Sequence, residues 1–416
     1  MPSAVASESD PPRVHAAPAD RALAVGAVVV ILAGIGTAVW MMHPPRAHRW
    51  SLIDLDVYRA AGRALWHHRS LYGPYVAEQL VVPLPFIYPP FAAILALPAT
   101  ALPGAGAAIA WTALTVLLLA YVVRRCFAPA IEAHGPIAWF LATAAMLALT
   151  PVQEHLRFGQ VGIPLLACVV ADCLGPRRRP TGALTGLAAA VKLVPGLFVP
   201  YLLLTGRRRA AATAVGVFAL AATLGTVVAP ADSERFWTDR VFTPTSPGFF
   251  SNQSLQGMLI RSIAPWRPVW IVTVLVTGAF GLAAATFASR SGDERRGVAL
   301  VALTAALVSP ISWIHHLVWL IPAFGVLTER VRTRRAAVGL TALALFCSAR
   351  VPYLGHDFLG PGAFGALVTD AYGFVTLGLL VYLGDPVTTA RGLRRTLTSR
   401  HPGSAAAGEA IDTTTP

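Results

Sequence analysis

Apolar stretches of membrane-spanning length recur along most of the chain and are separated by short polar segments. A helix that crosses the hydrocarbon core of a bilayer needs about 20 largely apolar residues. The pattern predicts about ten helical spans, at residues 22–42, 106–123, 136–150, 161–174, 210–228, 269–287, 297–312, 317–328, 336–349 and 364–383. The predicted class is therefore an all-α polytopic membrane protein.

Two apolar segments depart from this pattern. Residues 85–98 are too short for a span and have prolines at both ends, which indicates a broken or re-entrant element. Residues 182–204 have basic clusters on both sides, so both ends are expected on the same side of the membrane. We predict a re-entrant hairpin or two half-helices there, with a break near Lys192 and Gly196. With these pieces the chain has about 10–13 helical membrane segments.

The first polar segment, residues 43–85, holds a pattern typical of an interfacial helix. Leu55, Tyr58, Ala61 and Leu65 recur at helical spacing. We predict an amphipathic helix over about 52–65 that lies on the outer membrane surface.

Composition agrees with the membrane class and sets the orientation. Hydrophobic residues make up 55% of the chain and charged residues 13%, and the mean hydropathy is +0.61. The net charge of +13 falls in clusters at 124–125, 177–179, 207–209, 290–296 and 330–335, which indicate cytoplasmic loops rather than a nucleic-acid surface.

This distribution of charge predicts a multi-pass protein with both termini in the cytoplasm. Residues 21–384 form the membrane domain. Residues 1–20 and 385–416 are polar and are expected to form cytoplasmic tails, the first disordered and the second largely so.

The remaining polar residues gather in the predicted outer loops, where we place the candidate chemistry. Asp54 and Asp56 stand out because the chain has only 20 acidic residues. If their segment is helical, they point about 200° apart, so only one can face a cavity. Lys192 is the only lysine in the chain and lies at the predicted break, where it would line a cavity. The four cysteines show no metal-binding spacing.

Several short motifs, in this order, give the chain a resemblance to a known family. They are Asp54-Leu-Asp-Val-Tyr58, Phe86-Ile-Tyr88-Pro-Pro90, Gly159-Gln160, Gly186-Leu-Ala-Ala-Ala-Val-Lys192-Leu-Val-Pro195, Asn252-Gln253-Ser254-Leu255 and Ser309-Pro-Ile-Ser-Trp313-Ile-His315-His316. Over roughly residues 50–325 the chain resembles glycosyltransferase family 87, the polyprenyl-phosphate-mannose-dependent α-1,2-mannosyltransferases. The resemblance implies a GT-C-type bundle at the plasma membrane that works in glycolipid and cell-envelope biosynthesis, with its active site on the extracytoplasmic side.

The resemblance also implies a mechanism and a set of site residues. Inverting transfer from a polyprenyl-phosphate-sugar to a glycolipid or lipoglycan hydroxyl needs one general base, for which the family frame favours Asp54, with Asp56 as the fallback. Groups that contact the donor phosphate or sugar are expected among Lys192, His315, His316, Arg261, Asn252, Gln253, Gln160 and Tyr88. No metal and no other cofactor is needed on this scheme.

Two alternatives stay open at the level of sequence. A different GT-C transferase, such as one that moves arabinofuranose, would have the same fold and polar face. A transporter or flippase for a lipid-linked saccharide would also use broken helices and an intramembrane lysine, although the sequence has no clear internal repeat.

Overall fold

The computed structural model describes residues 52–389 apart from 79, 81–83, 176–181, 244–245, 263–266 and 361, together with six isolated positions between 21 and 32. Within this part of the chain all regular elements are helical, and the one isolated β-bridge joins Asn252 to Trp313. The predicted all-α class is confirmed. The predicted span 22–42 and the predicted tails lie largely outside the described residues.

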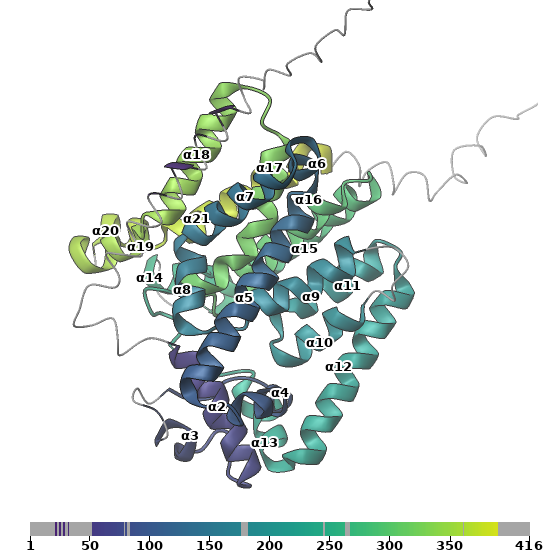
Figure 1. Ribbon diagram of the computed structural model, residues 1–416, viewed down its shortest axis with the longest axis vertical. Coiled ribbons are helices and arrows are strands. Elements are labelled where there is room, and N and C mark those ends of the chain that lie inside the picture. The colour runs from purple at the N-terminus through teal and green to yellow at the C-terminus, as the bar shows by residue number, and fades with distance from the viewer. Residues whose placement is uncertain are drawn as a thin grey trace, which may run out of the picture.

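Three straight helices are long and apolar enough to cross a membrane: α5 (Gly104–Cys126), α12 (Arg208–Val228) and α15 (Arg267–Arg290). Their exposed faces carry large apolar side chains such as Ile109, Val227 and Leu275, as expected of helices in contact with lipid. Figure 1 shows α5 and α12 running along the length of the molecule.

Three further candidate spans are helix pairs that bend at a short break. These are α7 (Pro136–Ala148) with α8 (Thr150–Phe158), bent by 73°, α18 (Arg334–Ser348) with residues Val351–Leu359, bent by 52°, and α20 (Ala363–Thr369) with α21 (Ala371–Gly384), bent by 61°. The segment Val351–Leu359 comprises α19 (Val351–Leu354) and η5 (Gly355–Leu359). By length and composition, the described residues thus contain three spans, or up to six with each bent pair as one.

The other apolar segments form shorter helices. Apolar but short are α4 (Pro90–Thr100), α9 (Gly162–Leu174), the segment Val194–Leu204 and the segment Ile314–Glu329, which comprises η4 (Ile314–Leu320) and α17 (Ile321–Glu329). α16 (Glu294–Val308) is buried along nearly its whole length and packs against α15, α17 and α21. The number of full-length spans is therefore lower than hydropathy suggests, because several apolar runs are buried against protein rather than stretched across lipid.

The break expected in residues 182–204 is present. α10 (Ala183–Val191) ends at Lys192, whose backbone is extended, and the chain resumes helically in η2 (Val194–Leu197) and α11 (Phe198–Leu204). α10 packs closely against α12: a Cβ on Gly182 or Gly186 would lie 2.0 or 2.2 Å from the carbonyl oxygen of Ala210 or Ala214. Two small residues four positions apart therefore let the two backbones touch, as in other membrane helix pairs.

One end of the bundle is formed by short elements. α2 (Ile53–Trp66), α3 (Pro74–Glu78), α4 and α13 (Pro230–Arg235) lie together below the long helices in Figure 1. The predicted helix over 52–65 is confirmed as α2, but it packs against α4 and buries Val57, Ala60 and Ala64 in addition to the predicted Leu55, Tyr58 and Ala61, whereas Leu65 is only partly buried. It is thus held in the protein more firmly than a surface helix.

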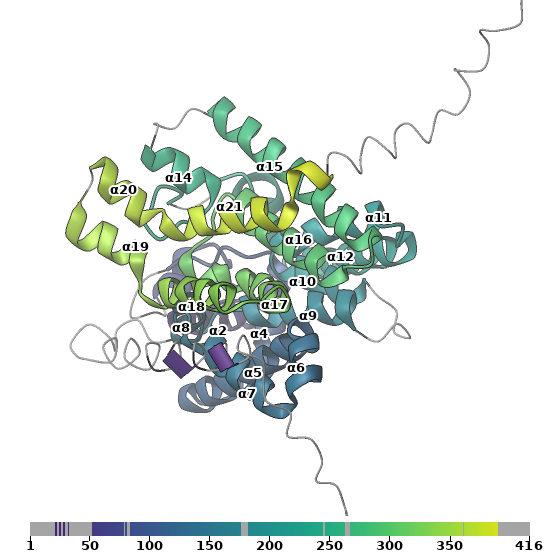
Figure 2. The same ribbon diagram turned by 90° about the horizontal axis from the view of Figure 1, so that it is seen from above.

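The remaining elements connect these parts. They are α6 (Ala128–His134), η3 (Phe236–Arg240) and α14 (Leu255–Ser262). Figure 2, in which the bundle is seen from above, shows α18, α19 and α20 along one side, with α8 and α2 beyond α18. α8 packs against η4 and also contacts α2, so the polar ends of these elements meet in the interior.

Candidate active site

The two acidic residues of α2 have different surroundings. Asp54 is partly buried, accepts a hydrogen bond from the Gln160 side chain and faces Lys192. Burial raises the pKa of Asp54 to about 6, although the Gln160 hydrogen bond and the Lys192 charge both act to lower it. Asp56 points outward, with 55% of its side chain exposed and Arg59 3.8 Å away. Of the two, Asp54 is therefore the carboxylate that faces the interior.

The position of Asp54 depends on a close contact between α2 and the end of α8. Leu52, at the start of α2, has a φ of 56°, and its N–H donates to the carbonyl of Arg157 at 2.6 Å. Gly159 ends α8 with a φ of 71°, and a Cβ there would lie 2.8 Å from the Cβ of Leu55. A glycine is needed at this position both for its backbone conformation and for its small size. This contact brings Gln160 next to Asp54.

Gln160 also contacts two buried tyrosines. Its Oε1 lies 3.3 Å from the hydroxyl of Tyr58 and 3.4 Å from that of Tyr88, and the two hydroxyls are 3.1 Å apart. The hydroxyl of Tyr72 donates to the carbonyl of Tyr88 at 2.7 Å. The sequence motifs predict Gln160 and Tyr88 as donor contacts, whereas Tyr58 is predicted only to pack. Its position one helical turn after Asp54 is the signal that could have identified it.

Lys192 and His316 meet on the other side of Asp54. Lys192 Nζ lies 2.8 Å from His316 Nε2 and 5.4 Å from the centre of the Tyr88 ring. The backbone N–H of Trp313 donates to His316 Nδ1, which fixes the ring. Both residues line a pocket together with Gly162 at the start of α9 and with Ser309 and Ser312. A lysine beside a helix N-terminus suits an anionic group, whereas the Ser309 hydroxyl already donates to the Ile311 carbonyl.

Two further histidines lie close to this pair. His315 is buried against Phe158 and His316, and neither of its ring nitrogens has a hydrogen-bond partner among the described residues. His155 accepts the N–H of Ile163 at 2.8 Å, and sequence analysis did not select it. Within the described ranges, no three His, Cys, Asp or Glu side chains are grouped so that they could hold a metal ion.

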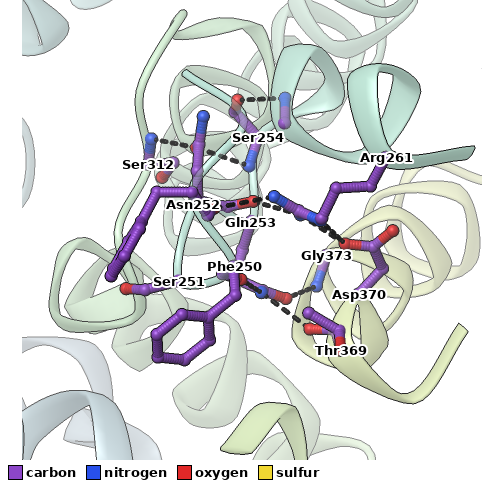
Figure 3. Close-up of polar contacts among 12 residues, drawn as sticks. Phe250, Ser251, Asn252, Gln253, Ser254, Arg261, Ser312, Thr369, Asp370 and Gly373 are labelled. Atoms are coloured by element: carbon purple, nitrogen blue, oxygen red, sulfur yellow. Dashed lines mark hydrogen bonds and ion pairs between the residues drawn. The ribbon is translucent and has the colours of Figure 1, made fainter. Parts of the chain in front are cut away.

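Asn252, Gln253 and Arg261, three of the predicted donor contacts, are engaged elsewhere (Figure 3). Asn252 donates to the carbonyls of Pro247 and Pro310 and accepts from the N–H groups of Ser254 and Ser312.

Gln253 donates to the carbonyls of Phe250 and Thr369 and accepts from Gly373, while Arg261 pairs with Asp370 and donates to the Phe249 and Asn252 carbonyls. Both amides are fully buried, and both of their nitrogens donate two hydrogen bonds. In this structure, these three residues join the 247–254 loop to residues 310–312 and to the start of α21.

More than half of the chain matches a known protein family. Residues 86–310 match glycosyltransferase family 87, a range that includes Tyr88, Gln160 and Lys192. The chain belongs to glycosyltransferase family 87. The family resemblance inferred from the motifs is thereby confirmed.

Members of the family from mycobacteria are similar over most of their length. A polyprenol-phosphate-mannose-dependent alpha-(1-2)-phosphatidylinositol mannoside mannosyltransferase of Mycobacterium tuberculosis is 32% identical over 88% of this chain and 92% of its own. The Mycolicibacterium smegmatis protein of the same description is 37% identical over 76% of this chain and 77% of its own. A pentamannoside mannosyltransferase of M. tuberculosis, also polyprenol-phosphate-mannose-dependent, is 31% identical over 74% of this chain and 73% of its own. No solved structure matches this family 87 chain.

Proposed function

We propose that this family 87 protein transfers mannose from polyprenol-phosphate-mannose to a hydroxyl of a phosphatidylinositol mannoside, in α-1,2 linkage. The family assignment and the relatives' activities support the donor and the acceptor class. The arginine clusters of the predicted cytoplasmic loops support an active site on the extracytoplasmic side of the plasma membrane.

The observation that carries the proposal is that one partly buried carboxylate faces a lysine–histidine pair beside a pocket. Asp54 acts as the general base and takes the proton of the acceptor hydroxyl as its oxygen bonds to the anomeric carbon of mannose. The bond between that carbon and the phosphate oxygen breaks, and its electron pair leaves with the polyprenyl phosphate. One displacement of this kind inverts the anomeric carbon.

The leaving phosphate needs donors and positive charge as its own negative charge develops. Lys192, His316 and the N-terminus of α9 at Gly162 are placed around the pocket for this role. His315 remains a predicted donor contact, and its unpartnered ring nitrogens support that role. We leave Asn252, Gln253 and Arg261 out of the donor site, because their polar groups are used within the protein.

The proposal is tested with membranes that contain the protein, labelled polyprenol-phosphate-mannose and defined phosphatidylinositol mannosides, with the linkage of the product read by mass spectrometry. Asp54→Asn should lower the transfer rate by about 10²–10⁴-fold, the usual contribution of a general base. Asp56→Asn is the matched control, since this carboxylate is exposed two positions away, and it should retain near wild-type transfer.

Three results would contradict the proposal. Full transfer by Asp54→Asn would show that Asp54 is not the general base. Loss of transfer in Asp56→Asn alone would assign that role to the exposed Asp56. A polyprenyl-phosphate-arabinofuranose donor is supplied in parallel. Transfer from this donor alone would show that the enzyme transfers arabinofuranose and not mannose. Movement of labelled lipid across the membrane without a new glycosidic bond would indicate a flippase.

A further inference from the structure

Three buried polar side chains lie behind Asp54 and make no direct contact with the pocket at Lys192. Tyr58, Tyr88 and Gln160 are each no more than 7% exposed, and their polar atoms lie within 3.1–3.4 Å of one another. Tyr58 follows Asp54 by four residues on α2, so both point to the same side of the helix. Asp54 and Tyr58 therefore reach Gln160 together.

The two phenols and the Asp54 carboxylate together fix the orientation of the Gln160 amide, because a phenol can donate or accept a hydrogen bond whereas an ionised carboxylate only accepts. A side-chain amide has an oxygen that accepts hydrogen bonds and a nitrogen that donates them. Two hydroxyl hydrogens can serve only two of the three contacts at once, so when both are used within this cluster at least one phenol donates to Gln160 Oε1. With its oxygen held in this way, the amide presents its nitrogen to Asp54. We propose that Tyr58 and Tyr88 are positioning residues that hold the Gln160 amide with its nitrogen toward the Asp54 carboxylate.

The same tyrosines connect the carboxylate with the cation. Tyr88 is anchored through its carbonyl by Tyr72, and its ring lies 5.4 Å from Lys192 Nζ. Tyr58 and Tyr88 pack edge to face with ring centres 5.3 Å apart. The Tyr88 ring therefore contacts Tyr58 on one side and lies near Lys192 on the other. The proposal rests on the role of Asp54 as the base.

Loss of both hydroxyls would leave Gln160 Oε1 without these donors in a buried site. The amide could then turn its oxygen toward Asp54 and disfavour the ionised carboxylate. The charged or titratable groups that face Asp54 are Lys192, Tyr58 and Tyr88, and replacement of the tyrosines by phenylalanine leaves Lys192 and both rings in place.

The test measures kcat/KM for mannosyl transfer against pH in the wild type, Tyr58→Phe, Tyr88→Phe and the double variant. The midpoint of the acid limb should move up by about one pH unit in the double variant, because a hydrogen bond to an ionised group is lost. Each single variant should shift less than half as much, since the remaining phenol can still donate. At pH values above the acid limb, the KM of each variant for the donor should stay at the wild-type value.

Tyr372→Phe is the matched control: it also removes a buried hydroxyl, which donates to the Cys347 carbonyl, and should leave the midpoint unchanged. A double variant with the wild-type midpoint, or with activity lowered equally at all pH values, overturns the positioning role. If the double variant does not fold, the midpoints of the single variants decide, and two unchanged midpoints also overturn it. A failure of the proposed function gives a different result: Asp54→Asn would then be active, which would show that Asp54 is not the base. Failure of the positioning role alone would leave Asp54→Asn inactive.

Discussion

Asp54 and Asp56 are two residues apart on α2, yet their surroundings predict different titrations. An aspartate in water has a pKa near 3.9. Burial raises the pKa of Asp54 to about 6. A general base works in its ionised form, so transfer should fall as the pH drops through about 6. We expect kcat/KM to show an acid limb with a midpoint near pH 6.

The matched control for this prediction is Asp56→Asn, which should keep the same limb because Asp56 points away from Gln160 and Lys192. A rate that stays constant from pH 7 down to pH 5 would show that no group with this pKa acts as the base.

Lys192 provides a second prediction at the scale of single residues. Lys192→Met keeps most of the length of the side chain but removes its charge from the pocket and from Asp54. Loss of one group that stabilises a developing anion typically lowers kcat by about 10²–10³-fold. We expect a loss of about 10²-fold, together with an upward shift of the acid limb, because the Lys192 charge lowers the pKa of Asp54. Unchanged kcat and donor KM would exclude Lys192 from the mechanism.

Single residues could be predicted from sequence where their scarcity gave a signal. Asp54, among few acids, and Lys192, the only lysine, were selected and lie together. Asn252 and Gln253 were selected by motif, but the motif cannot tell an amide that binds a ligand from one that holds a loop. Tyr58 and His155 were missed, because their partners are distant in sequence: Gln160 follows Tyr58 by 102 residues, and Lys192, which faces His155, lies on another element.

At the scale of elements, the break at Lys192 could be predicted, because basic clusters on both sides of an apolar run exclude a simple crossing. The bends between α7 and α8 and between α18 and α19 were not predicted. Hydropathy is averaged over a window of residues, so it gives no information about the direction of the helix axis. Pro151 and Pro352, each in the first turn of the second helix, are the local signals that mark these restarts.

The contact between α10 and α12 gives a prediction for that element. Gly186→Ala would place a Cβ 2.2 Å from the carbonyl oxygen of Ala214, so the helices must separate, at a cost of about 1–3 kcal/mol. We expect a lower melting temperature in detergent and reduced transfer, since α10 leads directly to Lys192. Gly216→Ala on α12 is the control, because a Cβ there meets nothing within 4 Å. Equal stability of both variants would show that the close packing is not required.

At the scale of the whole molecule, hydropathy and charge predicted the class and an orientation, whereas the packing of short helices around α16 could not be predicted.

α12 connects the two ends of the bundle. It begins at Arg208 and ends at Val228, a length of about 31 Å, which is close to the thickness of the hydrocarbon core. Ser70 donates to Asp232 just beyond its end, so the loop after α2 lies at the opposite end from the arginines at 207–209. The two ends should therefore be exposed on opposite sides of the membrane.

Single cysteines placed at these ends test the orientation. His67 and Arg209 are both exposed, whereas the native Cys126, Cys173 and Cys347 are buried and Cys168 is partly buried. With the unsubstituted chain as background, a membrane-impermeant maleimide should label His67→Cys on intact cells. It should label Arg209→Cys only after permeabilisation, since the positive-inside rule places this cluster in the cytoplasm. The reverse pattern would put Asp54 on the cytoplasmic side, and equal labelling of both would mean that α12 does not cross the bilayer.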